Sequence, residues 1–302
     1  MVIRRVLFIG LGNMGGPMAQ NLTGAGFEVL LFDANTEAVG RVAALSGARP
    51  VESTTAGAAE ADAVILMLPN SAVVERVLFG ERGVFSALTS GALVIDMGSS
   101  EPASTVAVAE IAARSGFDYV DAPVSGGVAK AESGELSIMV GGAGAGVERA
   151  HPLLQVLGSS IVHTGPSGTG HAAKALNNLL SATNLAAAAE VLIAARKFGI
   201  ASETMLSVIN GSTGRSQASE VKYAKHVLNG AFDSGFAMDL MLKDLAIARR
   251  LLEANEVTAP LVLTAEALAR DARESLGNTA PDHTEFVKYY EQENRVLLRA
   301  GR

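Results

Sequence analysis

The chain has 302 residues, of which 49% are hydrophobic and 18% charged, and its formal net charge is −7. This length predicts about two domains with a large apolar core. The acidic balance, without any basic cluster, argues against a nucleic-acid partner. There is no cysteine and the five histidines lack metal-ligand spacing, so neither disulfides nor a metal site are expected.

We expect a cytoplasmic protein with no membrane partner. An apolar strand begins within a few residues of the first methionine, which leaves no room for a signal peptide. No uninterrupted apolar run approaches the roughly 18 residues that span a bilayer.

The first predicted strand, residues 6–9, is followed at once by a G-x-G-x-x-G turn and then by a helical pattern from Pro17. In this strand–turn–helix context the glycines predict a dinucleotide site. The first permits a tight turn, the second lets the backbone approach a pyrophosphate, and the third lets the helix pack closely on the strand. A glycine-rich turn without a ligand is the alternative. The cofactor contacts expected here are Gly10, Leu11, Gly12, Asn13 and Met14.

A second predicted strand, Glu28–Phe32, ends in Asp33. A carboxylate about 20 residues after the glycines can accept hydrogen bonds from an adenosine ribose and would repel a 2′-phosphate. The next three residues, Ala34 to Thr36, offer no arginine to bind such a phosphate. We therefore expect NAD rather than NADP as the cofactor.

The first half of the chain continues to alternate strand and helix patterns. Further strands are predicted at 63–68, 92–97, 119–122, 136–140 and 161–163. This alternation is typical of a parallel, doubly wound α/β sheet, which binds ligands at the carboxyl ends of its strands. We predict an NAD-binding Rossmann domain over residues 1–164.

The pattern changes after a cluster of helix-breaking residues at 165–170. A long helix is predicted over 171–198, closed by Gly199. Further helices are predicted at 202–210, 217–228, 238–254, 262–276 and 284–298. No convincing strand remains, so residues 165–302 are expected to form an all-α domain for substrate binding and oligomerisation.

Lys174 is the first catalytic candidate, because it lies near the start of the long helix with Asn178 on the same face. The helix begins where the two predicted domains meet, which is where clefts form. A lysine desolvated in a cleft can act as a general acid/base. A solvated lysine is the alternative, and His171 is a rival base.

The segment Asp121-Ala-Pro-Val-Ser-Gly-Gly127 is the second candidate, because it ends a predicted strand. The two successive glycine N–H groups of Gly126 and Gly127, with the Ser125 hydroxyl, would make a cradle for a carboxylate. An ordinary turn is the alternative. The pair Lys243-Asp244 is a third candidate, although an adjacent lysine and aspartate usually decorate a surface.

Four motifs together resemble the β-hydroxyacid dehydrogenase family, which includes 3-hydroxyisobutyrate dehydrogenase, tartronate semialdehyde reductase and, more distantly, 6-phosphogluconate dehydrogenase. They are GLGNMGGPMAQNL at 10–22, DAPVSGG at 121–127 with SIMVGG at 137–142, GHAAKALNN at 170–178, and LMLKDLAIA at 240–248. They occur in the family's order and cover nearly the whole chain.

The resemblance implies hydride transfer between NAD and a small β-hydroxy acid of the 3-hydroxyisobutyrate type. Lys174 would be the general acid/base, Asn178 would orient it and the substrate, and Ser125, Gly126 and Gly127 would bind the substrate carboxylate. The family's other cofactor contacts match Leu68, Pro69, Asn70, Val73, Ser99 and Lys243. Relatives are commonly dimers or tetramers, so a homodimer or homotetramer is expected.

The alternative substrates within the family are tartronate semialdehyde, a sugar acid such as threonate, and sulfolactaldehyde. A catalytically silent NAD-binding scaffold would be expected to have lost Lys174 or the Ser-Gly-Gly segment, and this chain retains both. Lys130 stands where relatives usually carry glycine. It either binds a second acidic or sulfonate group or is a solvated charge, and the sequence favours the solvated charge.

Overall fold

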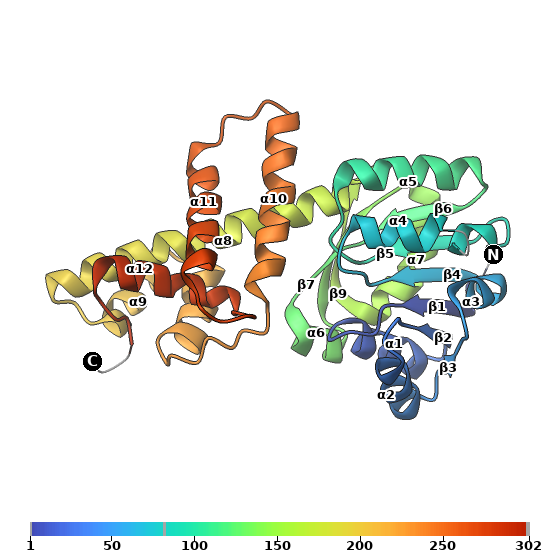
Figure 1. Cartoon of the computed structure of the whole chain (residues 1–302), viewed down its shortest axis with the longest axis horizontal. Coiled ribbons are helices and arrows are strands. Elements are labelled where there is room, and N and C mark those ends of the chain that lie inside the picture. The colour runs from blue at the N-terminus through green and yellow to red at the C-terminus, as the bar shows by residue number, and fades with distance from the viewer. Residues whose placement is uncertain (1, 81–82, 300–302) are drawn as a thin grey trace. The chain divides into compact units, whose positions relative to one another are not determined.

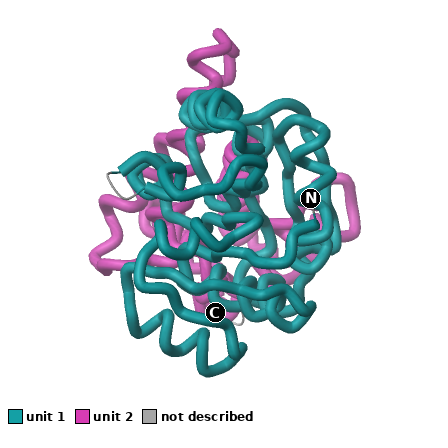
Figure 2. The backbone as a smooth tube through the Cα atoms, turned by 90° about the vertical axis from the view of Figure 1, so that its right-hand side faces the viewer, with its two compact units in different colours: residues 1–174 teal, residues 175–302 magenta. Residues whose placement is uncertain are grey.

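The computed structural model describes residues 2–80 and 83–299. The chain divides into two compact units, residues 1–174 and 175–302 (Figure 2). The first is built on a sheet with flanking helices and the second is helical, which confirms the predicted fold class (Figure 1). The functional domains predicted from the sequence, 1–164 and 165–302, stay a prediction.

In the described part of the first unit the strands form one nine-stranded sheet in the order β3-β2-β1-β4-β5-β6-β8-β7, with β9 paired to β8. The strands are β1 Arg5–Ile9, β2 Glu28–Phe32, β3 Arg49–Pro50, β4 Ala63–Leu66, β5 Leu93–Asp96, β6 Asp118–Asp121, β7 Val124–Ser125, β8 Leu136–Gly141 and β9 Gly158–Gly165. All pairs from β3 to β6 are parallel. The predicted parallel sheet is therefore correct for these six strands.

Beyond β6 the prediction of a parallel sheet is wrong, because β8 runs antiparallel to both β6 and β7 and parallel only to β9. The short strands β3 and β7 were not predicted. Each has two residues, too few to show the alternation of apolar and polar side chains that reveals a strand.

Helices cover both faces of this sheet. They are α1 Gly15–Gly24, α2 Thr36–Ser46, α3 Thr54–Glu60, α4 Ser71–Phe79, the 3₁₀ turn η1 Val84–Ser86, α5 Pro102–Arg114, α6 Gly127–Ser133 and α7 Gly144–Leu157. Successive strand residues point to opposite faces. Accordingly Val6 and Phe8 of β1 pack in one core with α1 and α7, whereas Leu7 and Ile9 pack in another with α3, α4 and α5.

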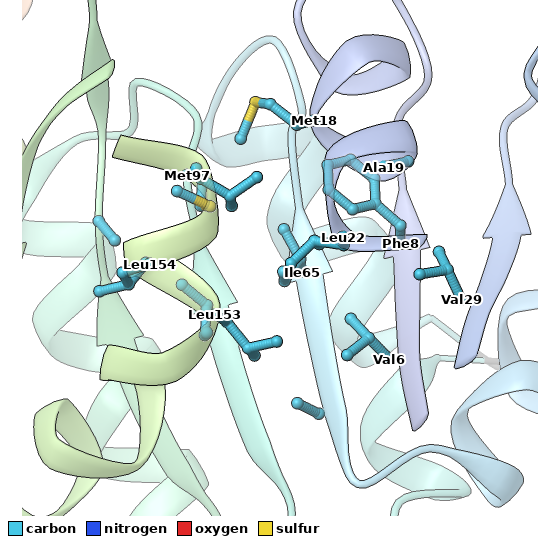
Figure 3. Close-up of a cluster of buried hydrophobic side chains, with 14 of the residues drawn as sticks. Val6, Phe8, Met18, Ala19, Leu22, Val29, Ile65, Met97, Leu153 and Leu154 are labelled. Atoms are coloured by element: carbon cyan, nitrogen blue, oxygen red, sulfur yellow. The ribbon is translucent and has the colours of Figure 1, made fainter. Parts of the chain in front are cut away.

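Figure 3 shows the first of these two cores. Strand residues such as Phe8 and Ile65 pack in one cluster with Met18 and Leu22 of α1 and Leu154 of α7. Because both faces of the sheet are covered, the central strands read as continuous apolar runs. Removing a fully buried side chain such as Phe8 would cost about 3–5 kcal/mol of stability.

In the described part of the second unit the regular elements are all helices joined by loops, apart from one isolated β-bridge between Ala237 and Asp282. Its elements are the greater part of α8 Thr169–Phe198, then α9 Ser202–Asn210, the π-helical η2 Ala218–Val227, α10 Met238–Ala254, α11 Pro260–Ser275, the 3₁₀ turn η3 His283–Glu285 and α12 Phe286–Asn294. The helix predicted over 284–298 therefore ends early, where Arg295 adopts a left-handed conformation with φ 55°.

Helix α8 has the length and composition of a membrane span, with a mean hydropathy of 1.4 over its most apolar 18-residue window. Polar residues such as Asn178 and Glu190 interrupt this helix, so it is not the continuous apolar run that the sequence analysis considered. Half of that window is buried inside the protein, where Leu185, Ala189 and Leu192 lie in the core of the second unit. Its apolar character is that of a core helix.

Candidate active site

The glycine turn joins β1 to α1 in the geometry expected of a phosphate-binding turn. Gly10 has φ +100°, and a Cβ there would overlap the backbone carbonyl of Met67. A Cβ on Gly15 would overlap the carbonyl oxygen of Gly10, whereas a Cβ on Gly12 would meet no atom within 4 Å. The fold itself therefore requires Gly10 and Gly15. Gly12 faces open space, as a backbone that receives a pyrophosphate must.

Asp33 follows β2 and ties this turn to the second strand. Its Oδ2 accepts a hydrogen bond from the backbone N–H of Leu11 at 2.6 Å, and its Oδ1 accepts one from Asn35 at 2.7 Å. An ionised carboxylate has about four acceptor positions, so both oxygens retain capacity for ribose hydroxyls. The glycines and this carboxylate thus fit a dinucleotide.

Residues 68–70 lie on the same sheet edge as the glycine turn, because β4 is parallel to β1 and ends at Leu66. Asn70 caps α4, since its Oδ1 accepts a hydrogen bond from the N–H of Val73 at 3.0 Å. Ser99 follows β5, which runs parallel to β4. The cofactor contacts predicted for this unit therefore come from consecutive loops along one edge of the sheet.

Arg41 is a residue that the sequence analysis missed. It comes from α2 and lines a cavity beside the glycine turn, together with Gly12, Asn13 and Gln20 and with Glu132 of α6. Arg41 lies beyond Ala34 to Thr36, the three residues in which the sequence offers no cation for a 2′-phosphate. It lies five residues, or about one and a half helical turns, after Thr36 at the start of α2, and this spacing was the signal that could have found it.

The sequence suggested that the Ser-Gly-Gly segment is a turn that follows a strand, but the structure shows a short strand that leads into a helix. Val124 and Ser125 form β7, which pairs with β8, and the chain then passes through Gly126 into α6. Gly126 has φ +139° and Gly127 has φ +73°. Both conformations favour glycine over any residue with a Cβ. The carboxylate-binding role of the segment stays a prediction.

Asp121, the first residue of the DAPVSGG motif, is fully buried and holds the beginning of α8. Its Oδ1 accepts a hydrogen bond from the N–H of Gly168 at 2.8 Å, and its Oδ2 accepts one from His171 at 3.0 Å. A Cβ at Gly141 or Gly170 would come within 2.6–2.8 Å of this carboxylate, so these glycines make room for it. The negative charge complements the positive end of the helix dipole.

His171 lies in the interior of the first unit with 1% of its surface exposed. Its Nδ1 lies 2.8 Å from Thr105 Oγ1, and its Nε2 lies 3.8 Å from Asp96 Oδ2. Asp96 also accepts a hydrogen bond from the Tyr119 hydroxyl at 3.3 Å. Burial, and secondarily the charge of Asp96, raises the pKa of Tyr119 well above its ordinary value. These contacts favour a structural role for His171 over that of a base.

Lys174 is half-buried on α8, three residues after His171. Asp121 therefore fixes the helical backbone one turn before this lysine. Asn178 follows four residues later along the same helix, the spacing that places two side chains on one face. Both sites were predicted from the sequence, and their catalytic roles stay predictions.

Within the second unit Asp244 contacts both Asn178 and Lys243, which belong to two different motifs of the sequence. Its Oδ2 accepts a hydrogen bond from Asn178 Nδ2 at 2.6 Å, and its Oδ1 lies 3.3 Å from the ammonium of Lys243. Asp244 is only 3% exposed, so the interpretation of this pair as surface decoration was wrong for the aspartate. Its position between the apolar Met241 and Leu245 on α10 was the available signal.

The glycine turn and Asp33 of the first unit fit the class of dinucleotide-binding α/β proteins. Two family models match the chain. The NAD binding domain of 6-phosphogluconate dehydrogenase matches residues 5–165, and the NAD-binding domain of NADP-dependent 3-hydroxyisobutyrate dehydrogenase matches residues 168–290. The chain belongs to the β-hydroxyacid dehydrogenase family, and it is a dehydrogenase that uses a nicotinamide cofactor.

Individual relatives match over most of their length. The chain is 42% identical to 2-(hydroxymethyl)glutarate dehydrogenase of Eubacterium barkeri, with 98% of each chain covered. It is 37% identical to 3-sulfolactaldehyde reductase of Escherichia coli, with 86% of each covered. A structure of Mycobacterium tuberculosis 3-hydroxyisobutyrate dehydrogenase with L-serine superposes with a TM-score of 0.86 at 34% identity, covering 95% of this chain and 99% of that one.

Proposed function

We propose that this protein transfers a hydride between NAD and the C3 hydroxyl or aldehyde of a small β-hydroxy acid of the 3-hydroxyisobutyrate type, with Lys174 as the general acid/base. The observation that carries this proposal is the double hydrogen bond of Asp121 to the start of α8. Asp121 therefore begins the segment that leads to Ser125-Gly126-Gly127, and it also fixes the start of α8, the helix that carries Lys174.

The residues of the first unit would hold the cofactor along the edge of the sheet. The backbone around Gly12 would receive the pyrophosphate and Asp33 the adenosine ribose. When bound, the nicotinamide accepts the hydride in oxidation and supplies it in reduction. The remaining contacts in our proposal are Gly10, Leu11, Asn13, Met14, Leu68, Pro69, Asn70, Val73 and Ser99, with Lys243 of the second unit.

The chain's own chemistry is a proton transfer. Neutral Lys174 accepts the proton of the substrate hydroxyl during oxidation, and its ammonium returns a proton to the oxygen during reduction. Asn178 would orient the substrate and the lysine. The Asp244 carboxylate, 2.6 Å from Asn178 Nδ2, limits rotation of that amide and supports such an orienting role.

Ser125, Gly126 and Gly127 would bind the substrate carboxylate. The Ser125 hydroxyl can donate one hydrogen bond, and the two glycine N–H groups can donate two more. Both glycines are exposed, which suits a segment that binds an anion. This arrangement requires an acid as the substrate.

The same machinery would serve other short acids. The relatives act on 2-(hydroxymethyl)glutarate and 3-sulfolactaldehyde by their names, and tartronate semialdehyde and sugar acids present similar groups. We also propose a cytoplasmic homodimer or homotetramer. The cysteine-free sequence fits a reducing compartment. The exposed apolar side chains Leu180, Val191 and Phe198 along α8 would be covered by a second copy.

A panel of C3–C5 hydroxy acids tests the proposal, with NADH absorbance as the readout. We expect NAD-dependent oxidation of 3-hydroxyisobutyrate or a close analogue, and loss of at least tenfold in kcat/KM when the carboxylate is replaced by its uncharged amide. Equal activity on an acid and its amide would refute the carboxylate cradle. No oxidation of any acid would refute the proposed function.

A further inference from the structure

Lys130 lies on α6, the helix that begins immediately after the Ser-Gly-Gly segment. Its aliphatic stem crosses the backbone of Gly126. A Cβ built on Gly126 would come 2.6 Å from Lys130 Cδ and 2.8 Å from its Cβ. The ammonium of this exposed lysine is two bonds beyond Cδ, so it can reach the rim of the proposed carboxylate cradle.

The helix offers Lys130 no charged neighbour. The residues three and four positions away on either side, which share its face, are Gly126, Gly127, Ser133 and Gly134. Glu132 is two positions along and therefore points to the other side of α6, where it lines the cavity beside α1 with Val128. Across residues 2–80 and 83–299, no ion pair or hydrogen bond of the Lys130 ammonium is found.

An unpaired ammonium on an ordered stem favours an anion. The glycine contact restricts the side chain, and this reduces the entropy that a flexible lysine loses when it binds a ligand. The chain as a whole is acidic, with a net charge of −7, so this cation is a local exception beside two exposed glycines. The position is suited to an anionic group next to the one that the glycines would hold.

We propose that Lys130 binds a second carboxylate of the substrate, so that the preferred substrate is a short β-hydroxy diacid rather than a monoacid. This inference rests on the proposed function, because it takes the Ser-Gly-Gly segment as the site of the first carboxylate. The sequence favours the interpretation of Lys130 as a solvated charge. The position of the Lys130 side chain over Gly126 is the reason to prefer a binding role instead.

Binding of two unreactive acids to the NADH-loaded protein tests this inference by calorimetry. Isobutyrate carries one carboxylate, and 2-methylglutarate carries the same carboxylate with a second one two methylene groups away. We expect Lys130→Gln to raise the Kd of 2-methylglutarate about fivefold, the upper range for an exposed ion pair, and to leave the Kd of isobutyrate within twofold. Lys130→Arg should restore tight binding of the diacid.

Lys225→Gln is the matched control, because it removes the same charge from an exposed lysine of the second unit. It should change neither Kd. Equal weakening of both acids by Lys130→Gln, no weakening of the diacid, or failure of the unmutated protein to bind the diacid would each overturn the inference. Since calorimetry needs no turnover, acids that bind in this pattern but are never oxidised would refute the proposed reaction and leave the diacid subsite standing.

Discussion

Gly12→Ala should weaken cofactor binding without lowering the stability of the fold. Gly15→Ala should instead lower the stability of the fold. A Cβ on Gly12 meets no protein atom within 4 Å, so the free energy of unfolding should stay within about 0.5 kcal/mol, as for an ordinary surface substitution. The methyl group would occupy the space where the backbone must approach the pyrophosphate. We expect the Kd of NAD to rise at least tenfold, which corresponds to about 1.4 kcal/mol.

Gly15→Ala places a Cβ against the carbonyl oxygen of Gly10, which is backbone and cannot rotate away. Overpacking of this kind costs about 1–3 kcal/mol or more. For a chain of this size each kcal/mol lowers Tm by roughly 2–4 °C. Thermal unfolding followed by circular dichroism should therefore show a fall of several degrees for Gly15→Ala and almost none for Gly12→Ala.

Gly40→Ala is the control, because Gly40 lies exposed within α2 and its Cβ would meet nothing within 4 Å. It should hold or raise Tm, since alanine has a higher helix propensity, and leave the Kd of NAD unchanged. NADH fluorescence titration measures the Kd of each variant. Equal losses of Tm in the Gly12 and Gly15 variants, or unchanged NAD affinity in Gly12→Ala, would refute the reasoning.

Three further substitutions probe the cofactor choice, the chemistry and the stability. Asp33→Ala removes the acceptor of the Leu11 N–H and the charge that repels a 2′-phosphate, so the ratio of kcat/KM for NAD over NADP should fall about tenfold; a preference of the unmutated protein for NADP would contradict this. Lys174→Ala should lower kcat by about 10²–10⁴ with the Kd of NAD nearly unchanged, and a near-normal kcat would remove the lysine from the mechanism. Burial lowers the pKa of His283 from 6.5 to about 4. Between these values the unfolded chain binds a proton that the folded chain does not, so this contribution to stability is complete above pH 6.5 and is lost as the pH falls towards 4, by about 3 kcal/mol in total. Urea unfolding at pH 7, 5 and 4 should show the loss in the unmutated protein and a smaller one in His283→Gln, and equal losses would contradict the assignment.

The sequence by itself determined those features whose cause is local. The turn from Gly10 to Gly15 could be predicted because its glycines mark conformations and close contacts that other residues do not tolerate. The central strands and the helix α8 were predicted because their apolar periodicity is set by what each residue buries. The positions of Asp33 after β2 and of Lys174 near the start of α8 followed from the same local patterns.

Only the tertiary structure decided which distant groups meet. Asp121 holds the N–H groups of Gly168 and His171, which are 47 and 50 residues away in the sequence. Asp244 binds Asn178 across 66 residues. The reversal of β8 likewise depends on pairing with β6 and β7 rather than on its own residues. A buried carboxylate is tolerated only where donors from elsewhere in the fold satisfy it, and no local pattern in a sequence records where those donors will be.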